Sequence, residues 1–209
     1  DMQAYRAQLL RFDSQGQALY DSDGLLVVDG DASGVRRVVD AGAYRTLAGR
    51  HPQVPITHWP ERIIAPGFID MHVHYAQTDI IGAPAAGLLP WLENYTFPAE
   101  SRFVDPQYAA EVAGVFFEEL MRNGVTTAVV FPTSHPASTD AFFTRAEHYG
   151  LRMIGGKVMQ DRNSPDGVRD ETEQSLIDTE TLIQRWHGKG RLGYAITPRF
   201  APTSSEAQL

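Results

Sequence analysis

The chain has 209 residues, of which 43% are hydrophobic and 21% are charged, as in an ordinary globular protein of one to two domains. Its formal net charge of −8 argues against a general nucleic-acid binder, because binding to a phosphate backbone requires a basic surface. The absence of cysteine excludes disulfides, thiolate metal sites and cysteine nucleophiles, so any metal must be held by histidine and carboxylate side chains.

Residues 1–62 contain short apolar runs that are separated by turn residues. The clearest runs lie at 24–30 and 34–39, where glycine and aspartate bound the apolar residues, a pattern typical of strands. We interpret this region as part of a small β domain that carries no chemistry of its own.

The segment 66–74, Pro-Gly-Phe-Ile-Asp-Met-His-Val-His, is the most informative part of the chain. Successive side chains of a strand point to opposite faces, so His72 and His74 share one face. Histidine is a common metal ligand and catalytic zinc takes three protein ligands, so the pair predicts part of a metal site. The alternative is a chance His-x-His pair on a half-exposed strand. Its position where the strand ends favours function, because functional residues lie at the carboxyl ends of parallel strands.

After residue 70 the sequence alternates between strand and helix patterns. Helices are predicted between Asp105 and Asn123, over 139–149 and over 171–187, and strands over 125–131, 152–158 and 191–197. This order predicts parallel strands joined by right-handed crossovers, as in a barrel or an open sheet. The two long connections, 75–105 and 159–170, follow strands on the face of the histidines and are predicted to be binding loops or lids.

Four blocks of the sequence resemble the amidohydrolase superfamily and, within it, the guanine deaminase family. The blocks are His72–Gln77, Leu89–Glu100, Gly156–Asn163 and Thr197–Phe200. The resemblance implies an α/β fold in which a (β/α)8 TIM barrel of a metal-dependent hydrolase is flanked by a β sandwich. Residues 1–62 would then form the N-terminal part of the β-sandwich domain, and residues 63–209 the first half of the barrel, about four βα units.

The resemblance also implies roles for individual residues of these blocks. The family's metal ligands match His72 and His74, and its purine contacts match Gln77, Arg199 and Phe200. A glutamine amide offers a donor and an acceptor to a purine edge, and an arginine fork pairs with the guanine oxygen and N7. The alternatives are that Gln77 is a loop hydrogen-bonder and Arg199 a surface cation. No catalytic residue for proton transfer is assigned within the chain.

Other polar and aromatic residues of the long connections are given supporting roles. Trp91, Tyr95 and Phe97 are interpreted as packing that shapes the wall of a pocket. The segment 161–163, Asp-Arg-Asn, is interpreted either as a local turn or as polar groups at the pocket mouth. For His135, which follows the second strand, we prefer a supporting or loop role over a third metal ligand.

The function implied by the resemblance is zinc-dependent hydrolytic deamination of guanine to xanthine and ammonia. The family places its remaining metal ligands and a proton-shuttling glutamate in the second half of the barrel, so we interpret this chain as an N-terminal half that is inactive alone. The alternatives are another amidohydrolase acting on a triazine or other heterocyclic amine, a non-catalytic half barrel, and a self-contained open α/β domain.

The expected partner is the small molecule guanine, with neither nucleic acid nor a membrane involved, and the family implies a homodimer. No apolar run approaches the roughly 20 residues that span a bilayer, and no signal pattern opens the chain. The sequence therefore predicts a cytoplasmic protein.

Overall fold

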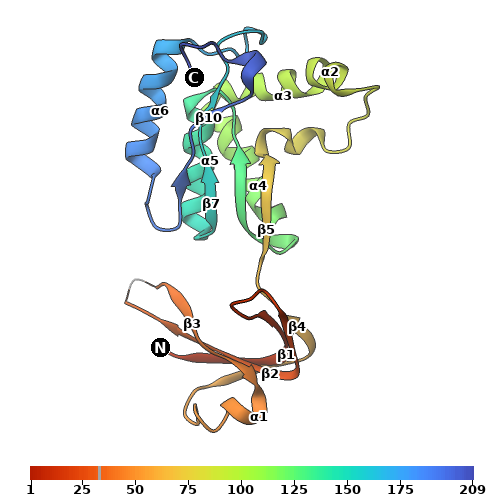
Figure 1. Ribbon diagram of the computed structural model, residues 1–209, viewed down its shortest axis with the longest axis vertical. Helices are drawn as coiled ribbons and strands as arrows, with labels where there is room; N and C mark the ends of the chain where they lie inside the picture. Colours follow the sequence, from red (N-terminus) through yellow and green to blue (C-terminus); the bar gives the residue numbers. More distant parts are fainter. Residues whose placement is uncertain (33) are drawn as a thin grey trace. The chain divides into compact units, whose positions relative to one another are not determined.

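A computed structural model describes residues 1–32 and 34–209 of the chain. These residues form two compact units, Asp1–Pro66 and Gly67–Leu209, coloured red to orange and yellow to blue in Figure 1. The boundary expected from the sequence at 62/63 falls inside a strand of the first unit, because that strand has no alternating apolar pattern to mark where it ends.

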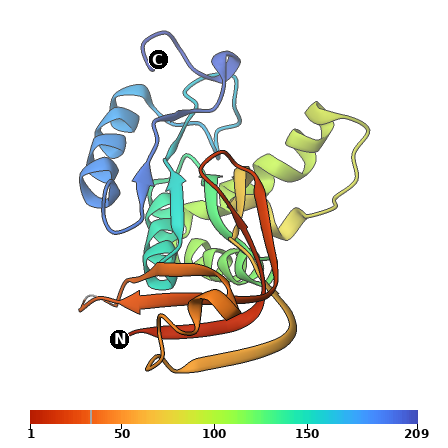
Figure 2. The ribbon, with the colours of Figure 1, turned by 60° about the horizontal axis from the view of Figure 1, so that its bottom comes forward.

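The N-terminal unit is a four-stranded sheet in the order β3-β2-β1-β4 (Figure 2). Its elements are β1 (Gln3–Phe12), β2 (Ala18–Gly30), β3 (Arg36–Ala43), α1 (Tyr44–Leu47) and β4 (Ile56–Ile64). Strand β1 pairs antiparallel with β2 and parallel with β4. A small core forms where Leu25 and Val27 of β2 pack with Ala4 and Leu47. The apolar runs expected at 24–30 and 34–39 thus lie largely in β2 and β3.

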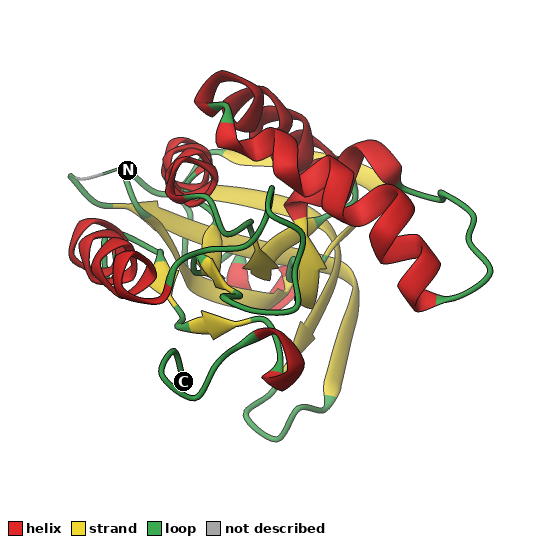
Figure 3. Ribbon diagram, turned by 90° about the horizontal axis from the view of Figure 1, so that it is seen from above, coloured by secondary structure: helices red, strands yellow, loops and turns green. Residues whose placement is uncertain are grey.

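The larger unit is built on a parallel sheet in the order β5-β6-β7-β9. The strands are β5 (Phe68–His74), β6 (Val125–Phe131), β7 (Arg152–Gly155) and β9 (Gly193–Tyr194), and the helices between them are α4 (Pro106–Arg122), α5 (Pro136–Tyr149) and α6 (Thr172–Trp186). Seen from above, the helices lie along the outside of the strands (Figure 3). None of the helices in the described residues is long and apolar enough to cross a membrane.

The ends of these helices follow from local sequence signals. The Asp105 carboxylate accepts a hydrogen bond from the Gln107 backbone N–H at 2.9 Å, and proline occupies the first position of α4. Helix α5 begins at Pro136, three residues earlier than expected, because proline fits the first turn of a helix. It ends where Gly150 adopts a left-handed φ of 65°, which glycine permits without strain.

Aromatic side chains join the three helices to the sheet. Phe117 of α4 and Phe142 and Phe143 of α5 are fully buried, and Phe143 stacks on Trp186 of α6 with ring centroids 5.6 Å apart. Tyr75, directly after β5, is also fully buried and donates a hydrogen bond to the Ser138 carbonyl at 2.7 Å. The carboxyl end of β5 is therefore anchored to the core.

Two strands expected to be continuous are interrupted. The strand expected over 152–158 is divided into β7 and β8 (Val158–Met159), and the strand expected over 191–197 is divided into β9 and β10 (Thr197–Pro198). Strands β8 and β10 pair in a separate two-stranded sheet. A Cβ on Gly156 would lie 1.8 Å from the carbonyl oxygen of Ala195, so the two backbones meet closely at the break. Lys157 then turns inward and donates to Asp170 at 2.6 Å.

The connection 75–105, expected to be a binding loop or lid, is mostly made of short helical turns. They are η1 (Tyr75–Ile80), α2 (Leu88–Trp91), η2 (Leu92–Thr96), α3 (Phe97–Ser101) and η3 (Arg102–Val104). Each turn is at most six residues long, and proline and glycine residues lie within or between the turns. The segment therefore shows no continuous helical periodicity in its sequence. Figure 1 shows this arm projecting from the carboxyl end of β5.

Candidate active site

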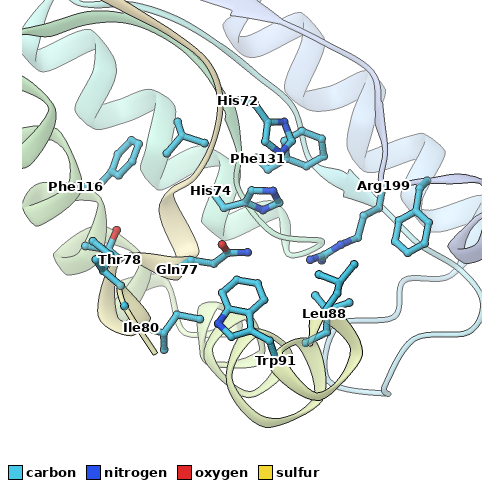
Figure 4. Close-up of a pocket in the computed structure, with 15 residues that line it drawn as sticks. His72, His74, Gln77, Thr78, Ile80, Leu88, Trp91, Phe116, Phe131 and Arg199 are labelled. Atoms are coloured by element: carbon cyan, nitrogen blue, oxygen red, sulfur yellow. The ribbon is translucent and has the colours of Figure 1, made fainter. Parts of the chain in front are cut away.

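A cavity of about 730 Å³ lies in the larger unit beside the carboxyl end of β5 (Figure 4). The five residues that the sequence marks as metal ligands or purine contacts all line it: His72, His74, Gln77, Arg199 and Phe200. They come from β5, from the turn η1 and from the segment after β10. The structure thus brings together residues that are up to 128 positions apart in the sequence.

The two histidines lie next to each other at the end of β5. Their ring centroids are 5.1 Å apart, and both rings contact Phe131 of the neighbouring strand β6. The Nδ1 atom of His74 is buried and has no hydrogen-bond partner among the described residues. Burial, with smaller contributions from the charges of Arg199 and His72, lowers the pKa of His74 to about 3. His74 is therefore neutral at pH 7, the form in which imidazole binds a metal.

Gln77 is placed by the tight turn η1. The turn buries Tyr75 and Ala76 on its inner side, and the Thr78 hydroxyl donates to the Tyr75 carbonyl at 2.6 Å. On its outer side Asp79 accepts a hydrogen bond from Tyr108 of α4 at 2.6 Å. Held at both sides, the turn directs the Gln77 amide into the cavity, where it faces His74 and Arg199 in Figure 4.

Arg199 follows β10 and reaches into the cavity from the opposite side. Its backbone N–H donates to the Met159 carbonyl at 3.0 Å. Its guanidinium donates twice to Glu100, from Nη1 at 2.6 Å and from Nη2 at 3.1 Å. The Arg199 side chain is only 7% exposed and that of Glu100 only 1%. Arg199 is therefore a buried, paired cation, and the surface-cation alternative is wrong.

Glu100 and Gln160 are site residues to which sequence reasoning assigned no role. Both lie in sequence blocks that carry the family resemblance. The sequence of a block does not show which distant side chains its polar residues contact, so the contact of each residue with Arg199 could not be foreseen. Gln160 is fully buried, its Nε2 donates to the Val168 carbonyl at 2.7 Å, and its Oε1 lies 3.4 Å from Nη1 of Arg199. Together the two side chains surround one end of the Arg199 guanidinium.

The aromatic residues of the arm 75–105 contribute to the wall of the site. Trp91 lines the cavity, and the Phe97 ring centre lies 5.4 Å from the Arg199 guanidinium carbon. Tyr95 is half-buried. The positions of Trp91 and Phe97 agree with the expectation that these aromatic residues pack around the pocket.

Asp161 is held by residues far from it in the sequence, rather than within a local turn. Its carboxylate accepts hydrogen bonds from the Ser205 backbone N–H at 2.7 Å and from the Thr172 hydroxyl at 2.6 Å. Burial raises the pKa of Asp161, but a hydrogen bond from the Ser205 hydroxyl, together with the two above, outweighs it, so the pKa lies below its usual value. His135 lies outside the cavity lining, at the start of α5.

The residues fit part of a metal site. Two imidazoles lie side by side on one cavity wall, and the buried Nδ1 of His74 lacks a partner. In the described ranges 1–32 and 34–209, no cluster of three or more His, Asp or Glu side chains is arranged to hold a metal. The pair therefore falls one short of the three protein ligands that catalytic zinc takes.

Comparison with known proteins assigns the family. Residues 63–209 match the model of the Amidohydrolase family. The chain belongs to this family. Guanine deaminase of Escherichia coli is 51% identical over 165 residues, which cover 77% of this chain and 37% of that protein. Guanine deaminase of Dictyostelium discoideum is 35% identical over 161 residues, covering 76% and 36%. The expected resemblance to guanine deaminases is confirmed.

Solved structures agree with the fold expected from the sequence. E. coli guanine deaminase superposes with a TM-score of 0.90 at 41% identity, covering 99% of this chain and 49% of that one. A C. acetobutylicum guanine deaminase with bound guanine superposes with a TM-score of 0.89 at 30% identity, covering 100% and 48%. The barrel-type amidohydrolase fold is therefore confirmed, and the chain spans about half the length of these relatives.

Proposed function

We propose that the protein to which this chain belongs catalyses the hydrolytic deamination of guanine to xanthine and ammonia. The observation that carries the proposal is that two neighbouring histidines, a glutamine amide and a buried arginine line one cavity, in a chain similar to guanine deaminases. Water would add to the ring carbon that bears the exocyclic amine, the carbon–nitrogen bond would break, and ammonia would leave.

Gln77, Arg199 and Phe200 are proposed to bind the purine. The Gln77 amide offers a donor and an acceptor, and the guanidinium of Arg199 suits the oxygen and N7 of guanine. Phe200 and the ring of Trp91 add apolar surface to the cavity for the flat ring system. The bound guanine named for the C. acetobutylicum relative supports a purine in this cavity.

His72 and His74 are proposed to provide two ligands to zinc. Zinc bound there would supply Lewis-acid activation of water at neutral pH. Neutral His74 needs no deprotonation before it binds a metal. No Asp or Glu side chain of the described residues lines the cavity, so we propose that another part of the whole protein supplies the third ligand and the proton-transferring carboxylate. The homodimer implied by the resemblance and the cytoplasmic location expected from the sequence also stay predictions.

The test is turnover by the full-length protein after loading with zinc. We expect loss of guanine with equal amounts of xanthine and ammonia, and no release of ammonia from the triazine melamine. His72→Ala is expected to abolish turnover, whereas replacing the exposed His148, which lies outside the cavity, with alanine should leave it unchanged. Release of ammonia from melamine but not from guanine would replace this proposal with the alternative of a heterocyclic-amine hydrolase.

A further inference from the structure

We infer that Glu100 is a positioning residue that turns one edge of the Arg199 guanidinium toward the substrate. This role rests on the proposed function, because it concerns how the purine-binding arginine is held. The two residues are 99 positions apart, on α3 and on the segment after β10, and meet beside the cavity.

The hydrogen bonds of Arg199 leave one edge of its guanidinium free. An arginine has five N–H donors in a fixed plane. Glu100 accepts one from Nη1 and one from Nη2, which occupies the end of the group. The Oε1 atom of Gln160 lies 3.4 Å from Nη1 and faces its second N–H. Nε–H and the second N–H of Nη2 have no hydrogen-bond acceptor in the part of the chain that the structure describes.

The two remaining donors suit recognition of a purine. Nε–H and this second N–H of Nη2 are parallel and lie along one side of the guanidinium. Together they can therefore donate to two acceptors. Figure 4 shows the guanidinium extended into the cavity toward Gln77 and His74. The guanine oxygen and N7 are two adjacent acceptors of the kind that such a fork pairs with. Because Glu100 occupies the end of the guanidinium, the edge formed by Nε and Nη2 is the one left to bind the purine.

Burial makes the carboxylate important for this geometry. Arg199 and Glu100 are both almost fully buried, and an unpaired charge in such a place is unfavourable. The backbone of Arg199 is fixed by its hydrogen bond to Met159, but its long side chain has several rotatable bonds. The bidentate ion pair restricts those bonds, and Phe97 of the same helix α3 packs near the guanidinium. Helix α3 therefore sets the direction of the purine-binding side chain.

Glu100→Gln is the variant that tests this role. It keeps the size of the side chain but places an amide N–H₂ against one guanidinium donor, so Arg199 retains only one of the two hydrogen bonds. We expect KM for guanine to rise about 10- to 100-fold, with a smaller change in kcat, since misplacement of a binding group by about 1 Å costs up to about 100-fold. Glu119→Gln, which removes an exposed ion pair with Arg122 on α4, is the matched control and should change KM less than about twofold.

A double-mutant cycle with Arg199→Gln, in the full-length zinc-loaded protein, separates positioning from a general structural effect. If Glu100 acts through Arg199, adding Glu100→Gln to Arg199→Gln should change kcat/KM less than about threefold, because coupled residues do not give additive losses. Losses that multiply, or an unchanged KM in Glu100→Gln, would overturn the inference.

A variant that fails to fold and a wild-type protein that is inactive have different consequences for the inference. Should Glu100→Gln fail to fold, Glu100→Asp retains the charge and withdraws the carboxylate by one methylene; a raised KM supports the positioning role, and an unchanged KM overturns it. A wild-type protein that does not consume guanine would overturn the proposed function and, with it, this inference. An active wild type with multiplying losses overturns the inference alone.

Discussion

Lys157 is a buried cation whose partners hold the segment between β7 and α6. Its ammonium donates to Asp170 at 2.6 Å and to the Ser175 hydroxyl at 2.8 Å, and the side chains of the ion pair are only 1% and 8% exposed. Lys157→Met leaves the carboxylate buried without its cation. We therefore expect a loss of about 3–5 kcal/mol in the free energy of unfolding, measured by urea denaturation.

The matched control for this prediction is Lys189→Met. Lys189 forms an ion pair with Glu147 in which both side chains are about half exposed. Exposed pairs contribute at most about 1 kcal/mol, so this variant should unfold close to the wild type. Equal stability of the Lys157→Met and Lys189→Met proteins would contradict a stabilising role for the buried pair.

At the scale of elements, helix α4 supports the turn that carries Gln77. Tyr108 of α4 donates to Asp79 of η1, and the Arg102 guanidinium carbon lies 3.9 Å from the centre of the Tyr108 ring. Tyr108→Phe keeps the ring and removes the hydrogen bond. We expect KM for guanine in the full-length protein to rise about 2- to 10-fold, because one hydrogen bond contributes about 0.5–1.5 kcal/mol.

Tyr149→Phe is the control for the Tyr108 variant. Tyr149 packs its ring against Phe117, and its hydroxyl makes no hydrogen bond within the described residues. Guanine kinetics of this variant should match the wild type. A Tyr108→Phe protein with unchanged KM would show that η1 holds Gln77 in place without help from α4.

Elements whose limits are set by neighbouring residues could be predicted from the sequence. Asp105 caps α4 from the adjacent position, and Gly150 ends α5 directly after its last residue. The β-branched run 125–131 coincides with β6. In each case the signal lies within a few residues of the feature it determines, so one sequence is enough.

Features that depend on distant residues could not be predicted. The break between β7 and β8 requires Gly156 to meet Ala195, which lies beyond α6 in the sequence. The orientation of Arg199 depends on Glu100, 99 positions away. The sequence shows that both charged residues exist, but only the fold brings them together. The metal role of His72 was predicted from its spacing to His74 at the end of a strand, whereas the roles of Gln77 and Arg199 came from the family resemblance.

At the scale of the whole larger unit, one edge of the sheet is conspicuously apolar. Strand β5 is the first in the order of the parallel sheet. Its Phe68, Ile69 and Met71 side chains are 68%, 64% and 69% exposed. Exposed apolar side chains on an edge strand favour association with further protein. This edge is therefore a surface of the larger unit on which we expect further protein to pack.

The metal site provides the prediction that belongs to the whole molecule. His72 and His74 supply two imidazoles, whereas catalytic zinc takes three protein ligands. A polypeptide of residues 1–209 alone is therefore expected to lose zinc to a mild chelator, and the full-length protein to retain one zinc per chain. Atomic absorption after dialysis measures both.

Variants of the full-length protein identify the ligands in the same assay. His72→Ala/His74→Ala should leave the protein without zinc, because removing both imidazoles leaves too few ligands to hold the ion. His148→Ala, at an exposed position next to Tyr149, should keep its zinc. Full zinc retention by the double variant would remove both histidines from the metal site. Zinc retention by the 1–209 polypeptide would instead mean that a third ligand lies within this chain.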